Sequence, residues 1–363
     1  MNILWMIILF LLPLLGQTYV SVRTWQLLPA LLPLRIAAVV LLWAAFLSFF
    51  VSMSGVVQRS SLSVATFFYE VGTSWVIILL YLFMLYGVMD LLRLTHVLPA
   101  SWVRQSWAGS CCVLTFMVGL FVYAHLHYTH KERVELHLDS HGKVSKPMRL
   151  VLISDVHLGY HNRRAELSRW LQLIAQERPD AVLIAGDLID GAIRPVEEER
   201  MAEAFRTLTV PVYCIPGNHD YLTGISTDER FCRQAGIVML RDSVAQLGRN
   251  VVLVGRDDRT NRQRHSLREV MQDVDRSQYI IEMDHQPYHL EEAQQAGVDF
   301  EFAGHTHYGQ VWPISWITRW VYEDAYGTLT KGQTQYYVSS GIGIWGGKFR
   351  IGTQSEYIVA TIH

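Results

Sequence analysis

The sequence predicts a layered α/β domain that follows an all-α domain of about four transmembrane helices. Three observations support this prediction. The composition changes sharply near residue 129, four long apolar stretches precede that point, and short β-rich segments alternate with helical patterns after it. The 363-residue chain has a net charge of -2, which gives no reason to expect a nucleic-acid partner.

Four apolar stretches are each long enough to cross a bilayer, which requires about 20 apolar residues. None contains Asp, Glu, Lys or Arg, and all are apolar on every side, which disfavours buried helices of a soluble protein. A cleaved signal peptide is disfavoured because no basic segment precedes the first stretch and three similar stretches follow it. We therefore predict a multi-pass cell-membrane protein with spans at Ile3–Val22, Ile36–Val57, Val71–Met89 and Trp107–Tyr128.

The predicted organisation is a transmembrane domain over residues 1–129, a connecting segment over 130–147 and an α/β domain over 148–363. The polar connecting segment forms either a linker or a strand leading into the domain. Arginines in the first and third loops favour an α/β domain outside the cytoplasm. Lys131 and Arg133 favour the opposite placement, so the side of the membrane stays open.

The α/β domain is predicted from buried-type strands separated by amphipathic helices. Helices are expected at Arg164–Glu177 and around Val196–Leu208. Strands are expected at Arg149–Ser154, Ala181–Ala185, Val212–Ile215, Val251–Val254, Tyr279–Met283, Phe300–Ala303, Tyr336–Ser339 and Tyr357–Ile362.

Five of these strands end in Asp, Asn or His residues, mostly beside glycine. Ligands of open α/β sheets bind beyond the carboxyl ends of strands, so we expect these side chains to converge. A single Asp-x-His would carry little information, but five such blocks in order do not share a structural explanation. The blocks contain Asp155 and His157, Asp187 and Asp190, Asn218 to Asp220, Asp284 and His285, and His305 and His307.

Imidazole and carboxylate donors suit Mn, Fe or Zn, and these blocks hold too many donors for one tetrahedral ion. Two divalent ions bridged by one carboxylate would use them all. Such a pair binds a phosphoryl group and generates a nucleophile from water. The chain contains neither a G-x-S-x-G nucleophile motif nor a G-x-x-x-x-G-K-[ST] phosphate loop.

The ordered blocks D-x-H, G-D-x-x-D, G-N-H-[DE], H and G-H-x-H resemble the calcineurin-like metallophosphoesterase superfamily. The resemblance covers residues 148–363 and implies a four-layer α/β/β/α sandwich. Within the superfamily, the sequence is similar to the YkuE/YaeI-like, membrane-associated bacterial branch. The similarity lies in DVHLG at residues 155–159 and GHTHYGQV at 304–311. Tyr308 and Ser355 depart from the branch pattern, which has glycine and proline at these positions.

The resemblance implies a role for each residue of the blocks. Two divalent metal ions per chain would be held by Asp155, His157, Asp187 and His307 on one side, and by Asn218, His285 and His305 on the other, with Asp187 bridging. His219 would contact the phosphoryl oxygen and protonate the leaving group, with Asp220 orienting its imidazole. Asp190 is expected to be structural.

Three further groups keep two interpretations each. The aromatic stretch Trp312–Trp320 either dips into the membrane interface or forms a hairpin packed on the domain. Arg163 and Arg164 either receive a substrate phosphate or begin a helix. Arg256, Arg259, Arg262 and Arg264 either bind an anionic headgroup or form a solvated face.

The predicted function is hydrolysis of a phosphomonoester, phosphodiester or pyrophosphate bond. Expected partners are the lipid bilayer and a phosphoester substrate, which membrane attachment suggests is lipid-linked. The alternative is a non-catalytic membrane receptor or transporter-associated protein with a binding-only domain. The complete ligand set argues against that alternative, and the near-neutral charge argues against a nuclease.

Overall fold

The computed structural model describes residues 3–363, without the side chains of residues 3–10 and Val56. The chain forms two compact units. One comprises Met1–His125 with Gly346–Lys348, and the other comprises Leu126–Trp345 with Phe349–His363. We refer to them as the helical unit and the α/β unit.

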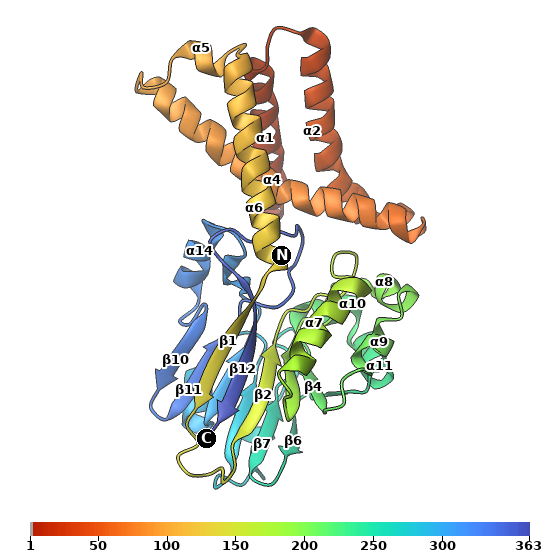
Figure 1. The fold of residues 1–363 in the computed structure, drawn as a ribbon, viewed down its shortest axis with the longest axis vertical. Helices are drawn as coiled ribbons and strands as arrows, with labels where there is room; N and C mark the ends of the chain where they lie inside the picture. The colour runs from red at the N-terminus through yellow and green to blue at the C-terminus, as the bar shows by residue number, and fades with distance from the viewer. Residues whose placement is uncertain (1–2) are drawn as a thin grey trace. The chain divides into compact units, whose positions relative to one another are not determined.

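The helical unit is built from long apolar helices (Figure 1). Their bounds, with two short helices between them, are α1 (Ile3–Leu27), α2 (Leu32–Ser52), α3 (Gly55–Gln58), α4 (Leu62–Leu94), α5 (Ala100–Val103) and α6 (Trp107–Thr129). Among the described residues, α2, α4 and α6 are long and apolar enough to cross a membrane. The first predicted span, Ile3–Val22, begins in residues whose side chains the structure does not describe. That this span crosses the membrane therefore stays a prediction.

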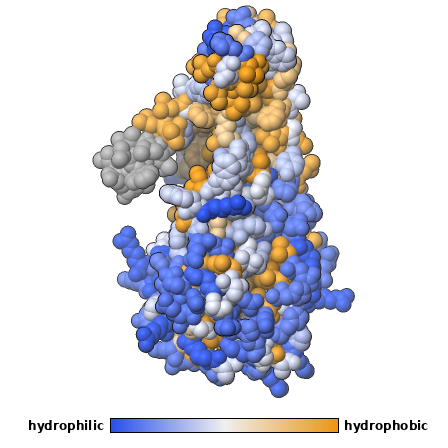
Figure 2. Space-filling view, turned by 90° about the vertical axis from the view of Figure 1, so that its left-hand side faces the viewer, coloured by the Kyte–Doolittle hydropathy of each residue, from blue (hydrophilic) through white to orange (hydrophobic). Residues whose placement is uncertain are grey.

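Several polar groups inside the helical unit are paired with one another. Arg23 forms an ion pair of 2.7 Å with Asp90, and the Trp75 indole donates to Gln17 Oε1 at 2.9 Å. Gly72 allows α4 to approach α2, because a Cβ at this position would lie 2.4 Å from the Phe49 backbone. Many large apolar side chains of these helices are exposed, and Figure 2 shows orange patches of them on one face.

The α/β unit contains two six-stranded sheets. The first has the order β1-β12-β2-β3-β4-β5, and the second has the order β10-β11-β9-β8-β7-β6. The strands of the first sheet are β1 (Lys131–Leu138), β2 (Met148–Ile153), β3 (Ala181–Ala185), β4 (Val212–Ile215), β5 (Ile237–Met239) and β12 (Ser355–Ile362). Those of the second are β6 (Ser243–Leu247), β7 (Val251–Gly255), β8 (Tyr279–Met283), β9 (Phe300–Ala303), β10 (Gly327–Lys331) and β11 (Thr334–Val338).

Three apolar clusters separate four layers. Leu152 and Leu183 of the first sheet share one cluster with Ile281 and Phe302 of the second, so the sheets pack face to face. The other face of the first sheet is covered by α7 (Arg164–Gln176), α8 (Ile193–Glu198), α9 (Met201–Phe205) and α11 (Ile225–Ala235). The other face of the second sheet is covered by α12 (Leu267–Val270) and α13 (Glu291–Ala296). This arrangement confirms the predicted α/β fold class.

The central parallel strands lie close to where the sequence placed them, and β3, β4, β8 and β9 match to the residue. The segment over 130–147 contains a strand rather than only a linker: β1 pairs in parallel with β12 along eight residues. The helix predicted around Val196–Leu208 is broken into α8 and α9 at Arg200, which adopts a left-handed φ of 53°. The edge strands β5, β6 and β10 were not predicted, because their exposed positions weaken the apolar signal.

Candidate metal centre

The strand-end residues converge at one edge of the two sheets. Asp155 and His157 follow β2, and Asp187 follows β3. Asn218 begins α10 (Asn218–Thr223) directly after β4. His285 follows β8, and the pair at 305 and 307 follows β9, with His307 opening the 3₁₀ helix η1 (His307–Gly309). The strands are parallel here, so their carboxyl ends deliver all seven predicted ligand residues to one region.

One group of donors contains Asp155, His157 and His307. The two imidazoles approach each other with an Nε2–Nε2 distance of 3.0 Å. His307 Nε2 lies 3.5 Å from Asp155 Oδ1. Asp187 Oδ2 lies 3.6 Å from His157 Nε2, so that carboxylate borders this group as predicted for a bridging residue.

A second group contains Asp187, His285 and His305, with Asn218 between the two imidazoles. His285 Nε2 lies 3.3 Å from Asp187 Oδ2 and 3.2 Å from Asn218 Oδ1. His305 Nδ1 lies 2.8 Å from the same amide oxygen. Asp187 therefore joins the two groups, and every other predicted ligand belongs to the group expected for it.

The donor set fits a cation on chemical grounds. His285 Nδ1 lies 2.8 Å from the Ala185 carbonyl, and a hydrogen bond to that carbonyl places the ring proton on Nδ1. In the neutral ring the lone pair of Nε2 faces oxygens of Asp187 and Asn218, which also accept hydrogen bonds. Without a cation, burial of His285 opposes its protonation, but the charge of Asp187 outweighs burial and raises the pKa of His285 well above its usual range. Three acceptors at such distances repel one another unless a proton or a cation lies among them. Neutral imidazole with carboxylate and amide oxygens is a donor set for a divalent ion.

The backbone at the site is held in an uncommon conformation. Left-handed φ values are seen for Asp155 (52°), His157 (47°), Asp187 (52°), His305 (69°) and His307 (46°). A non-glycine residue in this region costs on the order of 1–3 kcal/mol, and such residues cluster at functional sites. Surrounding contacts over-determine these turns. Five of the seven predicted ligands are strained, which favours a functional explanation over a structural one.

Two glycines make room for the carboxylates. A Cβ at Gly217 would lie 2.2 Å from Asp187 Oδ1, and a Cβ at Gly304 would lie 2.6 Å from Asp155 Oδ2. Any side chain at either position would displace a donor oxygen. The glycines of G-N-H and G-H-x-H are therefore explained by close approach to the predicted ligands.

The predicted contact between Asp220 and the His219 imidazole is wrong. His219 Nδ1 lies 2.8 Å from Asp190 Oδ1, and the His219 backbone N–H donates to Asp187 Oδ1 at 2.8 Å. The Asp220 carboxylate instead accepts backbone N–H groups of Gly217, Leu188 and Ile189. Asp220 sits at the third position of α10, where its side chain turns back to its own helix start. Asp190, which the sequence assigned a structural role, orients the imidazole.

Electrostatics separate the histidines of the site into two classes. Burial lowers the pKa of His305 to about 3 and holds that of His307 well below its usual range, so both rings stay neutral, as metal ligands must. Burial alone would also lower the pKa of His219. The hydrogen bond that His219 donates to Asp190 and the charge of Asp187 outweigh burial and raise the pKa of His219 to about 9.

Two buried positioning residues escaped the sequence analysis. Arg350 is fully buried and donates to the carbonyls of His307 at 2.6 Å and Ser340 at 2.5 Å. Asn162 donates to the carbonyl of His157 at 3.1 Å and accepts from the Tyr128 hydroxyl at 2.7 Å. Both act on the backbone of ligand turns, and only tertiary contact distinguishes them from surface residues of the same type.

Four of the other cationic candidates contact carboxylate residues. Arg163 and Arg164 bond Glu199 across the start of α7, which supports the helix-start interpretation. Arg256 is buried against Glu282 at 3.1 Å, and Arg264 binds Asp284 at 2.7 Å.

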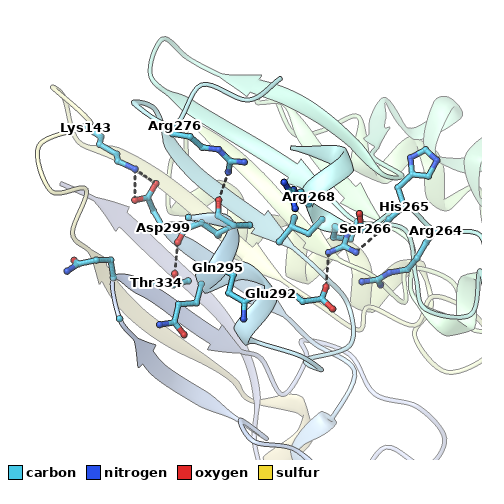
Figure 3. Close-up of a pocket in the computed structure, with 18 of the residues that line it drawn as sticks. Lys143, Arg264, His265, Ser266, Arg268, Arg276, Glu292, Gln295, Asp299 and Thr334 are labelled. Atoms are coloured by element: carbon cyan, nitrogen blue, oxygen red, sulfur yellow. Dashed lines mark hydrogen bonds and ion pairs between the residues drawn. The ribbon is translucent and has the colours of Figure 1, made fainter. Parts of the chain in front are cut away.

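Those two arginines line a groove of about 1410 Å³ on the α12–α13 side of the second sheet (Figure 3). Lys143, a third cation of the groove, is paired with Asp299 at 2.8 Å. None of the predicted ligands lines the groove, which therefore is not the candidate metal centre.

Comparisons with known proteins agree with this geometry. Residues 148–309 match the model of the family described as calcineurin-like phosphoesterase. The chain is 29% identical over 220 residues to an uncharacterized metallophosphoesterase of Helicobacter pylori (strain J99), which covers 59% of each chain. It is also 29% identical over 255 residues to an uncharacterized metallophosphoesterase of Aquifex aeolicus, which covers 67% of this chain and 96% of that one.

A vertebrate relative has the same two-part description. The chain is 27% identical over 239 residues to a Danio rerio protein named "transmembrane protein with metallophosphoesterase domain", which covers 61% of this chain and 55% of that one. The chain spans about six tenths of the length of its Helicobacter relative and about half of the length of the Danio rerio protein. The branch within the superfamily stays a prediction. All seven predicted ligand residues lie within residues 148–309, the part of the chain that matches the calcineurin-like phosphoesterase family.

Proposed function

We propose that this chain is a membrane-anchored phosphohydrolase that holds two divalent cations, with Mn, Fe and Zn as the candidates. Its reaction would cleave a phosphomonoester, phosphodiester or pyrophosphate bond of a lipid-linked substrate. The observation that carries the proposal is the pair of donor groups joined at Asp187. The family match over residues 148–309 supports the same chemistry.

The proposed ligands divide as the two groups do. Asp155, His157 and His307 would hold one ion, and Asn218, His285 and His305 the other, with Asp187 contributing to both. When bound, such a pair of cations polarises phosphoryl oxygens and lowers the pKa of a water nucleophile. The strained turns keep the donor atoms in place before substrate arrives, which reduces reorganisation during the reaction.

His219 is the proposed proton donor to the leaving oxygen. Asp190 engages Nδ1 at 2.8 Å, which fixes the ring orientation and leaves Nε2 for the substrate. The backbone N–H of His219 holds Asp187 at the same time, so the acid and the bridging carboxylate are positioned by one helix start. Asp220 contributes indirectly, because it anchors that helix start to the turn after β3.

Anchoring in a membrane is supported by three candidate spans in the helical unit and by the transmembrane relative of Danio rerio. A substrate with a lipid part follows from that location. A binding-only receptor domain is the alternative, and the intact donor set disfavours it. A decayed domain would not keep five strained turns around a complete set of ligand residues.

The test compares Asp187→Ala with the exposed carboxylate variant Asp275→Ala as control. Full-length protein is reconstituted with Mn, Fe or Zn and assayed on soluble phosphomonoesters, phosphodiesters and pyrophosphates, with metal content measured by elemental analysis. We expect about two ions per chain in wild type. We expect Asp187→Ala to reduce turnover by on the order of 10⁴-fold or more, because it removes the group common to both positions. A folded wild type that binds at most one ion, or an Asp187→Ala variant with wild-type turnover, contradicts the proposal.

A further inference from the structure

The α/β unit carries an apolar face that points outward, on α14 (Ile314–Val321). Trp316 is 63% exposed, Ile317 58% and Trp320 87%, and Val321 beside them is 48% exposed. These four positions, spaced i, i+1, i+4 and i+5, share one side of a helix. Scattered exposed apolar residues are ordinary, but a contiguous patch with two tryptophans indicates an interaction surface.

The opposite side of the helix attaches it to the α/β unit. Ser315 is buried, and Arg319 lies over the Tyr308 ring at 5.1 Å. A Cβ at Gly309 would lie 2.5 Å from the Ser315 backbone nitrogen, so α14 packs directly against η1. The sequence left open a hairpin packed on the domain at Trp312–Trp320. The structure has a helix there instead, with its aromatic side chains exposed.

The α14 face adjoins the candidate metal centre. The chain passes from His307 through η1 into α14 within seven residues. At the other end of α14, Tyr322 brings its ring to 6.1 Å from the His305 ring and bonds the Tyr288 hydroxyl at 3.0 Å. Both ends of the helix are therefore tied to ligand turns, and whatever covers the face lies beside the site.

We propose that the α14 face (Trp316, Ile317, Trp320 and Val321) inserts into the headgroup region of a lipid bilayer. This inference rests on the proposed function and deepens it, because it places the hydrolytic site at the depth of lipid phosphates. Tryptophan is enriched at membrane interfaces, where its apolar ring and its N–H are both satisfied. An amphipathic helix with such a face lies in the plane of the interface.

The continuity of the chain selects a bilayer over other occupants of this face. The candidate span α6 ends at Thr129, and β1 of the α/β unit begins at Lys131. A single residue between them keeps the α/β unit close to the membrane surface at all times. The local concentration of bilayer around α14 is consequently high, whereas a second copy of the chain would have to be recruited by diffusion.

A fluorescence experiment tests insertion without reference to activity. Full-length wild type and Trp320→Phe are reconstituted in phosphatidylcholine–phosphatidylglycerol vesicles, and the difference between their emission spectra isolates Trp320. We expect lipids brominated near the glycerol backbone to quench this difference signal. We expect aqueous acrylamide to quench it less than it quenches the tryptophan of a soluble peptide. Quenching by acrylamide alone, with no effect of brominated lipid, overturns the proposal.

A kinetic experiment connects the face to substrate access. The double variant Trp316→Ser/Trp320→Ser is compared with Val238→Ser/Val244→Ser, whose parent residues are exposed on the edge strands β5 and β6. The substrates are soluble bis(4-nitrophenyl) phosphate and vesicle-bound 4-nitrophenyl hexadecyl phosphate. We expect the tryptophan variant alone to lose roughly tenfold or more on the vesicle-bound ester and to keep its rate on the soluble ester.

The two experiments separate failure of this inference from failure of the proposed function. If wild type cleaves neither ester, phosphodiester hydrolysis is excluded from the proposed function, and quenching of Trp320 still decides the α14 face. If wild type cleaves both esters and the tryptophan variant is unaffected on vesicles, the inference fails and the hydrolase stands. A dimer in detergent that the tryptophan variant dissociates would assign the face to a second copy and also overturn the inference.

Discussion

The two units place the same residue types in opposite environments. In the helical unit, Leu41 and Leu114 are 68% and 65% exposed, and only 11–28% of the residues in the three candidate spans are buried. In the α/β unit, Leu150 and Leu152 are completely buried between the sheets. Leucine leaves water in both cases, but in the α/β unit it is covered by protein and in the helical unit by the expected lipid.

Polar groups differ between the units in the reverse sense. Several of those inside the helical unit pair with one another, as Arg23 does with Asp90. In the α/β unit, carboxylate and amide oxygens of the candidate metal centre gather around imidazole nitrogens, as Asp187 and Asn218 do around His285 Nε2. An ion pair of this kind stabilises a fold, whereas a cluster of facing acceptors needs a proton or a cation among them. The comparison therefore assigns anchoring to one unit and chemistry to the other.

The sharpest test of the chemical assignment is His219→Ala. If its imidazole protonates the leaving oxygen, turnover of an alkyl phosphoester should fall by roughly 10²–10⁴-fold. A 4-nitrophenyl ester needs less protonation, so its loss should be smaller. Metal content should remain unchanged, because His219 is proposed as the acid and not as a ligand. Its imidazole nevertheless lies close enough to His157 and Asp187 to share an ion with them, so metal content is measured as well. Equal losses for both esters would leave His219 as a phosphoryl contact, and loss of metal would make it a ligand.

A matched pair of valines tests the difference in environment. Val118 in α6 is 55% exposed and Val238 in β5 is 48% exposed. Aspartate at the centre of a membrane span costs about 2.5–3.5 kcal/mol, whereas an exposed strand position loses about 1 kcal/mol or less. Val118→Asp should therefore reduce the yield of membrane-inserted, monodisperse protein far more than Val238→Asp. Equal yields would argue that α6 faces water.

The smallest expected effects separate two neighbouring carboxylates. Asp190→Asn should lower turnover by about 10–100-fold with little change in thermal stability, because it disturbs only the orientation and basicity of His219. Asp220→Asn should instead lower the free energy of unfolding of the α/β unit by about 1–3 kcal/mol, because it removes an acceptor for buried backbone N–H groups. Turnover and melting temperature, measured on both variants, would contradict this division if the two patterns were exchanged.

The sequence by itself determined the fold class, the candidate spans in α2, α4 and α6, and the central strands. It did so because these features depend on local periodicity, on the length of apolar stretches and on turns where glycine permits close approach. Convergence of the seven predicted ligands was also foreseeable, since parallel strands end at one edge of a sheet. The sequence left residues 130–147, which contain β1, open between a linker and a strand, and it did not predict the edge strands β5, β6 and β10. These strands have outward-facing residues, which weaken the apolar pattern.

Only the tertiary structure decided which carboxylate orients His219. Asp220 is its neighbour in sequence, but the first turn of α10 directs that side chain back to the helix start, and Asp190 arrives from the turn after β3. The same holds for Arg350, whose contact with the His307 carbonyl joins residues 43 positions apart. It also holds for the aromatic face of α14, because sequence alone does not say which side of an eight-residue helix packs. Side-chain partners depend on where distant turns meet in space, and that information is absent from local pattern.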